Sequence, residues 1–284
     1  MITPGQKIGT FQVGNLIGEG ATASVFHATD TKLNRPVAIK VLKEDLPESS
    51  RERFVREVKT LVEVRHAAIV HVYTAGIEGG SPYYVMEHLS GRSIKEMITH
   101  RKGKGVPVFR HDEILSIGRQ LAEALGALHK ARIIHRDLKP SNVMIVPPMK
   151  AKVIDFGLVQ VGSGARMGER SRGLGTQAYM SPEQLEGGLI GEQSDLFQIG
   201  LILHEMVTGE QLGGHGVPPW FGKSQWNPPL PSSTDPKLPP DLEKAIVARP
   251  LRDPRPHRHR RDGGGVSRHP ERPRSAGGHQ GHEG

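Results

Sequence analysis

Apolar and polar side chains alternate near the start of the chain with the period of two that is typical of β-strands. The alternation runs over short segments between residues 11 and 46, and glycines or turn-forming residues separate them. Strands are expected at residues 11–20, 23–30 and 36–43, and again at residues 69–73 and 83–88. Tight turns are expected to join the first three.

The apolar period changes to that of a helix further along. Phe54, Val58 and Leu61 recur at helical spacing within residues 49–64, where Ser49 and Glu52 fit a capping box. A second amphipathic helix is marked by Ile114, Ile117, Leu121, Leu125 and Leu128. Residues 195–208 are apolar nearly all round, which predicts a buried helix that ends at Gly209. A small β-rich lobe followed by a larger helical lobe is therefore expected, which is an α+β fold.

Composition narrows the chemistry. The chain has 284 residues and no cysteine, which excludes disulfides, thiolate nucleophiles, iron–sulfur clusters and cysteine-based zinc sites. The formal charge is +8, but residues 249–284 hold nine arginines against four acidic residues. Most of the charge therefore belongs to the tail and says little about partners of the folded part.

No apolar run reaches the roughly 18 residues that a membrane helix needs. The first ten residues also lack the charged-then-apolar layout of a signal peptide. A soluble, cytoplasmic protein without a membrane segment is expected.

Three weak signals of phosphate chemistry come early in the chain. Gly18-Glu19-Gly20 lies between two expected strands, where missing Cβ atoms let backbone N–H groups approach a phosphate. Lys40 closes the apolar strand Val-Ala-Ile-Lys. Glu57 lies among core-facing positions of the first helix, where a charge is costly unless it is paired, so Lys40 is its expected partner. Each signal alone is also compatible with a plain turn, a strand-end lysine or a solvated glutamate.

Two denser motifs follow. His-Arg-Asp-Leu-Lys-Pro-Ser-Asn occupies residues 135–142, and Asp155-Phe156-Gly157 ends an apolar run where a carboxylate suits a metal ligand. Together with the glycine loop and the Val-Ala-Ile-Lys strand, these motifs match the protein-kinase signature in order. The chain resembles a eukaryotic-type (Hanks-type) serine/threonine protein kinase over roughly residues 11–250, and residues 179–184 resemble the bacterial branch. The resemblance implies a bilobal kinase fold.

The resemblance implies roles for particular residues. Lys40, oriented by Glu57, resembles the lysine that holds the ATP phosphates. Asp137 resembles the catalytic aspartate, and Lys139 the lysine that steadies the γ-phosphate and accompanies Ser/Thr specificity. Asn142 and Asp155 resemble the two ligands of Mg²⁺, for which Mn²⁺ is a possible substitute.

The ATP site is implied in the same way. Main-chain contacts to the phosphates are expected from the glycine loop, which comprises Ile17, Gly18, Glu19, Gly20 and Ala21. Val25, Ala38 and Met144 are expected to sandwich the adenine, with Met86 as gatekeeper. Backbone groups of Glu87 and Leu89 are expected to hydrogen-bond the adenine edge. Ala23 replaces the third glycine of the pattern.

Residues 155–183 resemble an activation segment, and Asp195 resembles the buried aspartate that anchors the catalytic loop. Arg136 precedes the catalytic Asp137, so a phosphate on the segment would find a cation nearby. Autophosphorylation is expected at Ser163 or Ser171, and plain loop serines are the alternative. Thr176 is expected to be structural.

The resemblance stops near the end of the chain. Pro250 interrupts a helix, and His257 stands where the family has an arginine that pairs with the residue corresponding to Glu183. Residues 251–284 are rich in Arg, His, Gly and Pro and are expected to be disordered. A truncated or frame-shifted C-lobe end is one hypothesis; a basic arm for nucleic acid and a histidine-rich metal tract are the alternatives. Nucleic-acid binding is not expected, because no aromatic residues interrupt the charge.

We therefore expect an N-lobe at residues 11–89, a C-lobe at 90–250 and a tail at 251–284. The predicted function is transfer of the γ-phosphoryl group of ATP to Ser/Thr hydroxyls of proteins, including the protein itself. One alternative is a nucleotide-binding pseudokinase or scaffold that the damaged C-lobe end has inactivated. Another is a small-molecule kinase of similar fold.

Overall fold

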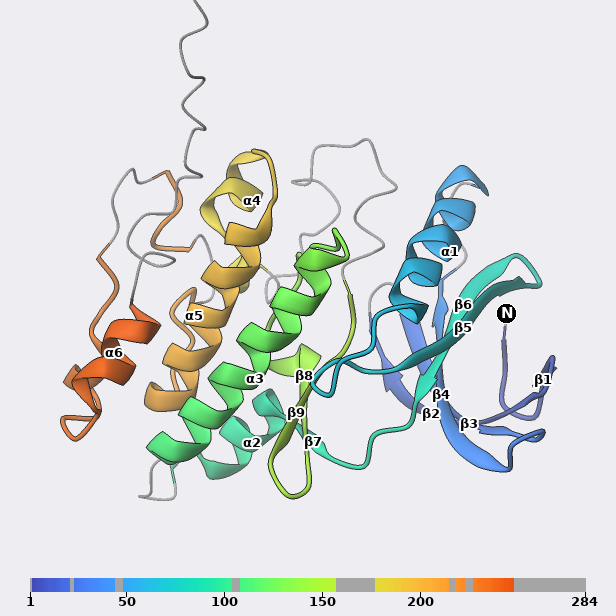
Figure 1. Cartoon of the computed structure of the whole chain (residues 1–284), viewed down its shortest axis with the longest axis horizontal. Coiled ribbons are helices and arrows are strands. Elements are labelled where there is room, and N and C mark those ends of the chain that lie inside the picture. The colour runs from blue at the N-terminus through green and yellow to red at the C-terminus, as the bar shows by residue number, and fades with distance from the viewer. Residues whose placement is uncertain are drawn as a thin grey trace, which may run out of the picture.

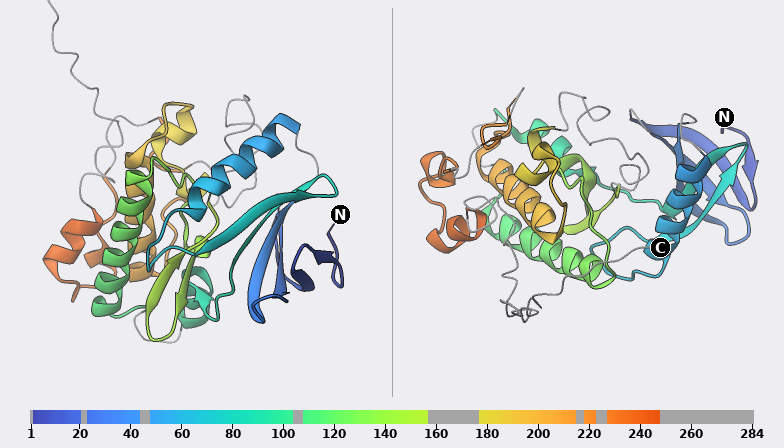
Figure 2. Two further views of the ribbon diagram at one scale, coloured as in Figure 1. Left: turned by 45° about the vertical axis from the view of Figure 1, so that its right-hand side comes forward. Right: turned by 90° about the horizontal axis from the view of Figure 1, so that it is seen from above.

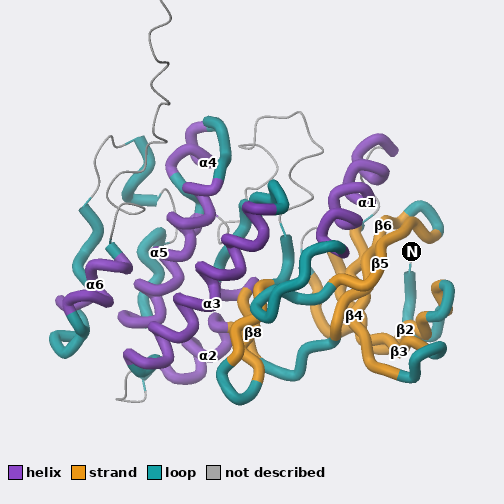
Figure 3. The backbone as a smooth tube through the Cα atoms, viewed as in Figure 1, coloured by secondary structure: helices purple, strands orange, loops and turns teal. Residues whose placement is uncertain are grey.

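The computed structural model describes residues 2–20, 23–43, 48–103, 108–156, 177–214, 218–222 and 227–247. The tail expected at 251–284 lies outside these residues. A body of strands with one helix lies beside a body of helices with a small second sheet, as expected for the two lobes (Figures 1 and 3). Nowhere in the described ranges does a helix have both the length and the apolar character needed to cross a membrane.

The larger sheet has six antiparallel strands in the order β1-β2-β3-β4-β6-β5. Its strands are β1 Lys7–Ile8, β2 Phe11–Glu19, β3 Ala23–Asp30, β4 Arg35–Leu42, β5 Val72–Glu78 and β6 Ser81–Glu87. The three strands expected between residues 11 and 43 are confirmed. The strand expected at residues 69–73 is wrong in position, because β5 begins at Val72 and Ile69 instead forms an isolated parallel bridge with Val153.

Helix α1, Glu48–Val62, packs against β5 and β6 (Figure 2). Its predicted apolar face is confirmed, since Phe54, Val58 and Leu61 are all buried. The side chains of Ser49 and Glu52 lie outside the described part of the chain, so the capping box stays a prediction. Glu57 is half-buried on this helix.

The second body is mainly helical. Its helices are α2 Ile94–Arg101, α3 His111–Lys130, α4 Pro182–Glu186, α5 Glu192–Thr208 and α6 Pro240–Ile246, with 3₁₀ turns η1 Pro140–Asn142, η3 Gln177–Tyr179 and η4 Pro231–Ser233. A three-stranded sheet of β7 Arg92–Ser93, β8 Val143–Val146 and β9 Lys150–Val153 lies with them. Helices α3 and α5 confirm the two predicted helices. Gly209, at a φ of 70°, ends α5 in the left-handed conformation that glycine favours.

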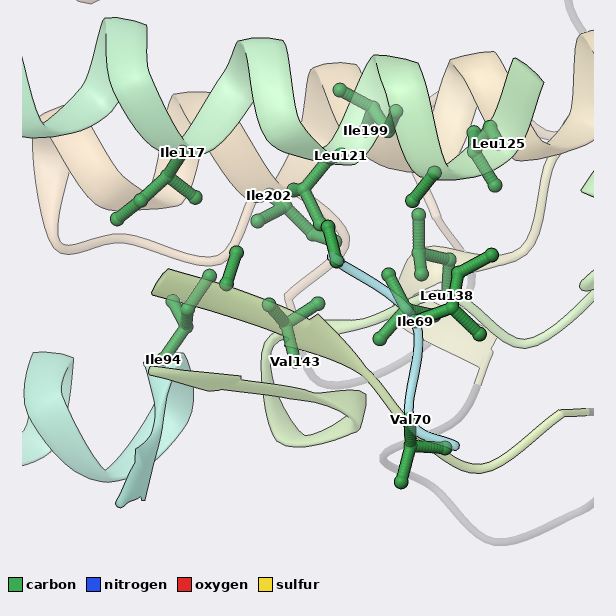
Figure 4. Packing of buried hydrophobic residues seen from close by; sticks show 14 of the residues in the cluster. Ile69, Val70, Ile94, Ile117, Leu121, Leu125, Leu138, Val143, Ile199 and Ile202 are labelled. Carbon is green, nitrogen blue, oxygen red and sulfur yellow. The ribbon is translucent and has the colours of Figure 1, made fainter. Parts of the chain in front are cut away.

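The core of this body lies between α3, α5 and the small sheet (Figure 4). Ile117, Leu121 and Leu125 of α3 pack with residues of α5 and with Val143 of β8. Leu138, from the loop that follows α3, is completely buried in the same cluster. Because Leu138 is held by the core, its neighbours in the loop have fixed places at the core's edge.

Helix α5 is buried nearly all round, and its polar groups are paired as burial requires. The Glu205 carboxylate accepts hydrogen bonds from the Tyr179 hydroxyl and from Lys95 Nζ, at 3.1 Å. Burial and the charge of Glu205 raise the pKa of Tyr179, so this hydroxyl stays a donor. The Ser194 hydroxyl donates to Glu183. The partner expected for Glu183 near residue 257 lies outside the described residues.

His204 of α5 gives the protein a pH-dependent stability. Its Nε2–H donates to the Pro229 carbonyl, at 3.3 Å, and burial lowers its pKa below 6.5. At a pH somewhat below 6.5, the unfolded chain therefore binds a proton at His204 that the folded chain does not bind. The stability from neutral His204 is present above pH 6.5 and is lost as the pH falls below that value, at up to about 1.4 kcal/mol per pH unit.

We expect His204→Gln to flatten the fall in unfolding free energy between about pH 6.5 and pH 5. Denaturant unfolding at a series of pH values measures it. The matched control is His100→Gln, at an exposed position of α2, which should leave the slope as it is. An unchanged slope in His204→Gln would contradict the assignment.

Candidate active site

Asp195 of α5 anchors the loop that contains the His-Arg-Asp motif. Its carboxylate accepts the backbone N–H groups of His135 and Arg136, each at 2.9 Å, and His129 Nε2–H at 2.8 Å. The side chain of Asp195 is completely buried. A buried carboxylate with three donors is well satisfied, and here it fixes the start of the loop.

Arg136 has a φ of 67°, a conformation that costs a non-glycine residue on the order of 1–3 kcal/mol and persists only where surroundings enforce it. Asp195 holds its N–H, and its carbonyl accepts from Gln184 Nε2 at 2.6 Å and Gln198 Nε2 at 3.2 Å. Gln198 Oε1 also accepts the N–H of Leu138. The backbone N–H and the carbonyl of Arg136 are therefore both held, and this fixes the direction in which the chain enters Asp137.

The His135 side chain joins this loop to the segment that precedes Asp155. Its Nε2 bonds to the Ile154 carbonyl at 3.2 Å, and the Asp137 N–H bonds to its Nδ1 at 3.3 Å. Burial lowers the pKa of His135, which agrees with a neutral ring that donates from one nitrogen and accepts at the other. The ring also lies 5.3 Å from that of Phe156, centroid to centroid. The two sequence motifs therefore pack against each other.

The Asp137 carboxylate is set between two donors. Lys139 Nζ lies 2.8 Å and Asn142 Nδ2 3.1 Å from its Oδ2. Asn142 Nδ2 also bonds to the Asp137 carbonyl, at 2.8 Å. Asp137 is part-exposed rather than buried, so an incoming group can reach it.

Asp155 follows β9 and faces Lys40 across the two bodies. Lys40 Nζ lies 2.7 Å from Asp155 Oδ1. The backbone of Asp155 has a φ of 56°, and its carbonyl lies 3.5 Å from Asn142 Nδ2. Burial, together with the charge of Asp155, raises the pKa of Tyr84. The expected pair of Lys40 with Glu57 stays a prediction.

The glycine loop is the turn between β2 and β3. Gly18 pairs with Val25, and the Gly20 N–H donates to the Ala23 carbonyl at 2.8 Å. Ile17 and Glu19 of this strand are exposed, and Glu19 pairs with Lys43 at 3.3 Å. Ala21 lies outside the described residues.

The residues expected around the adenine are mostly gathered. Ala38 and Met86 are buried in one apolar cluster, and Val25 and Leu89 pack against it. Met144, half-buried on β8, stands outside that cluster. The Glu87 N–H donates to the His71 carbonyl, and its carboxylate pairs with Lys152 at 2.6 Å. The Glu87 backbone N–H is therefore already engaged within the protein.

A cavity of about 400 Å³ lies away from these groups. It is lined by Ser90–Arg92 with residues of α2, of β8 and of the β8–β9 turn, such as Met97, Ile145 and Met149. None of the expected ATP-site residues lines it.

The oxygen atoms present suit a hard divalent cation. Asn142 donates with its Nδ2, and its amide oxygen, which accepts from the Ser141 hydroxyl at 3.5 Å, keeps a second lone pair for a ligand; Asp155 adds a carboxylate. In the described ranges no three His, Asp or Glu side chains gather as a metal site. Magnesium is typically held by one or two carboxylates together with substrate phosphates, so these residues fit it.

Sequence reasoning missed two contributors, Gln184 and Gln198, which hold the loop. The only signal for Gln198 is its spacing, three residues after Asp195 on the same helix. The expected phosphorylation sites Ser163 and Ser171, with Thr176, lie outside the described residues.

Comparison with known proteins gives the family. A model of the protein kinase domain matches residues 11–216. A probable serine/threonine-protein kinase of Streptomyces coelicolor is 34% identical over 264 residues, which cover 89% of this chain and 38% of that protein. The serine/threonine-protein kinase PknB of Mycobacterium tuberculosis is 33% identical over 271 residues, which cover 89% of this chain and 41% of its own length. The chain thus spans about two fifths of each.

Solved structures agree on the fold. The crystal structure of the kinase domain of Mycobacterium tuberculosis PknI superposes with a TM-score of 0.67 at 21% identity, covering 88% of this chain and 93% of that one. The expected bilobal kinase fold is confirmed.

Proposed function

Because this chain belongs to the protein kinase family, and to its bacterial serine/threonine branch, we propose that it transfers the γ-phosphoryl group of ATP to Ser and Thr hydroxyls of proteins. The observation that carries the proposal is the place of the Asp137 carboxylate, accessible and 2.8 Å from a lysine ammonium in the next turn of the loop. A base at this place can accept the proton of an attacking hydroxyl, and the neighbouring cation can neutralise charge on the phosphate that is attacked.

In the reaction we propose, Asp137 accepts the proton of the substrate hydroxyl. The hydroxyl oxygen forms a bond to the γ-phosphorus, and the bond from that phosphorus to the β–γ bridging oxygen breaks. Lys139 neutralises charge on the transferred group, and Lys40 holds the α- and β-phosphates with Glu57 as its orienting partner. Most of the acceleration comes from positioning and electrostatics, which rigid loop geometry supplies.

Asn142 and Asp155 would hold the magnesium ion, with manganese as a substitute. When bound, the ion offsets charge on the phosphate oxygens. For the nucleotide we propose the glycine loop, including Ala21, above the phosphates. Val25, Ala38 and Met144 would then sandwich the base with Met86 as gatekeeper, and backbone groups of Glu87 and Leu89 would hydrogen-bond its edge.

Lys139 supports Ser/Thr over Tyr specificity, as in the family resemblance. Autophosphorylation in residues 157–176, at Ser163 or Ser171, is part of the proposal. Its support is the buried Arg136 Nε, which has no hydrogen-bond partner among the described residues. We also propose a cytoplasmic site of action, and the lobe limits 11–89 and 90–250.

The pseudokinase interpretation finds no support, because Lys40, Asp137, Asn142 and Asp155 are all present. They are also linked: Asn142 contacts Asp137 and Asp155, and Asp155 pairs with Lys40. The small-molecule kinase reading is weaker too, since the named relatives are serine/threonine-protein kinases.

The test is transfer of labelled γ-phosphate from ATP to a basic Ser/Thr protein substrate and to the chain itself. We expect phosphoserine or phosphothreonine that forms with Mg²⁺ and not with excess EDTA. Label on tyrosine only would refute the specificity. Folded, monodisperse protein that binds ADP without transferring label would favour the scaffold reading.

A further inference from the structure

The cavity of about 400 Å³ beside α2 has no part in the reaction as proposed. Its volume falls within the range of about 300–1,000 Å³ that is typical of ligand pockets. It lies between α2, β7 and the β8–β9 hairpin, which are side by side in the helical lobe (Figure 1). The lobe that carries the catalytic loop therefore has a second pocket of ligand size.

The wall of the cavity is mostly apolar. Met97 of α2, Ile145 and Val146 of β8, and residues 147–149 of the turn line it. Methionine side chains are flexible, so those at positions 97 and 149 can adapt to apolar groups of different shape. The wall therefore suits a ligand that brings apolar side chains, without demanding one particular side chain.

Two arginines supply the charge at this cavity. Arg101 is held in place, because its Nη1 donates to the Val108 carbonyl at 2.9 Å and pairs with Glu113 at 3.4 Å. Arg92 is exposed and forms no hydrogen bond or ion pair with the residues that the structure describes. Among the described residues that line the cavity, none is Asp or Glu. A carboxylate is therefore the complement of this site.

The charge of the site disfavours the chain's own tail as its occupant. Residues 249–284 hold nine arginines against four acidic residues, so they carry the same sign of charge as Arg92. A second copy of the chain would bring the same tail. Because the chain belongs to a family that acts on proteins, an acidic segment of another protein is the occupant that fits.

Strand β8 connects the cavity with the catalytic loop. It begins at Val143, directly after Asn142, and its residue Ile145 lines the cavity. None of the residues expected around ATP lines the cavity. A partner bound here and ATP therefore contact different residues and can be bound together.

We propose that this cavity is a docking site for an acidic segment of a protein substrate. Apolar side chains of the segment enter the cavity, and one of its carboxylates pairs with Arg92. Docking holds the substrate in the lobe that carries Asp137 and takes no part in the transfer itself. The role as a substrate site rests on the proposed function, but the binding of the segment does not.

The first experiment screens short peptides of random sequence on a synthetic array for binding to the whole chain, with Mg-ADP present. We expect enrichment of Asp and Glu together with Leu, Ile, Met or Phe. Fluorescence anisotropy then measures the affinity of one selected peptide. Arg92→Glu should lower that affinity about tenfold, the size of one hydrogen bond between charged groups. Since Arg92 is exposed, this variant should fold like wild type.

Lys130→Glu is the matched control. It makes the same change of charge at an exposed residue of α3 that does not line the cavity. It should bind the selected peptide as wild type does. The proposal is overturned if acidic peptides with apolar residues are not enriched, if basic peptides are enriched instead, or if the two variants bind the peptide alike.

The second experiment joins the selected peptide to a basic Ser/Thr substrate. We expect the fusion to lower KM about tenfold with kcat unchanged, because docking raises the effective concentration of the substrate. Arg92→Glu should remove this gain and leave transfer to the unfused substrate as in wild type. An unchanged KM for the fusion would refute the role as a substrate site. Peptide binding in a chain without transferase activity would support the docking site and refute the catalytic proposal, and transfer without peptide binding would do the reverse.

Discussion

Asp137→Asn is expected to lower the rate of phosphoryl transfer by about 10²–10⁴-fold, the usual contribution of a general base. The amide has the size of the carboxylate, so the contacts of Lys139 and Asn142 with this position persist in part. What is lost is the group that takes the hydroxyl proton. Single-turnover transfer with saturating Mg-ATP measures this step without product release.

The matched control is Asp112→Asn, at an exposed residue of α3 that pairs with Arg110. It should transfer phosphate at the wild-type rate. Both variants should unfold at denaturant concentrations close to that of wild type. Equal rates in wild type and Asp137→Asn, above the background without enzyme, would mean that another residue is the general base.

Local periodicity explains which parts of the fold were predictable. The hairpins of β2, β3 and β4 and the helices α3 and α5 carry their patterns within one segment. The misplaced strand shows the limit. Residues 69–73 alternate like a strand, but Ile69 pairs with Val153, far away in the sequence. The short strand β7 also depends on distant pairing, because its partner is β8, far along the chain, and no local pattern encodes that.

The candidate site divides in the same way. Asp137, Asn142 and Asp155 were predictable because their residue types are demanded by chemistry and stand in a dense motif. Gln184 and Gln198 were not, because a glutamine on a helix is ordinary. Their role depends on the Arg136 carbonyl, distant in the sequence, to which both side chains donate. The partner of Lys40 at 2.7 Å, Asp155, likewise comes from the meeting of two lobes.

The strongest structural prediction concerns Asp195, on which the loop depends. Asp195→Ala removes one carboxylate and leaves three donors, from His129, His135 and Arg136, without their acceptor in a completely buried place. We expect the free energy of unfolding to fall by about 3–5 kcal/mol. The strained φ of Arg136 then loses a restraint, so transfer activity should fall even in protein that remains folded.

Glu192→Ala on the same helix is the control. Its carboxylate is 60% exposed and lies 3.9 Å from Nδ1 of the less exposed His129, a long contact with one exposed partner, of the kind that contributes about 0–1 kcal/mol. Denaturant unfolding monitored by circular dichroism compares the two variants, and activity is measured on the folded fraction. A stability loss below about 1 kcal/mol in Asp195→Ala would mean that water replaces the carboxylate. In that case the loop would owe its shape to Gln198 and to the burial of Leu138 rather than to Asp195.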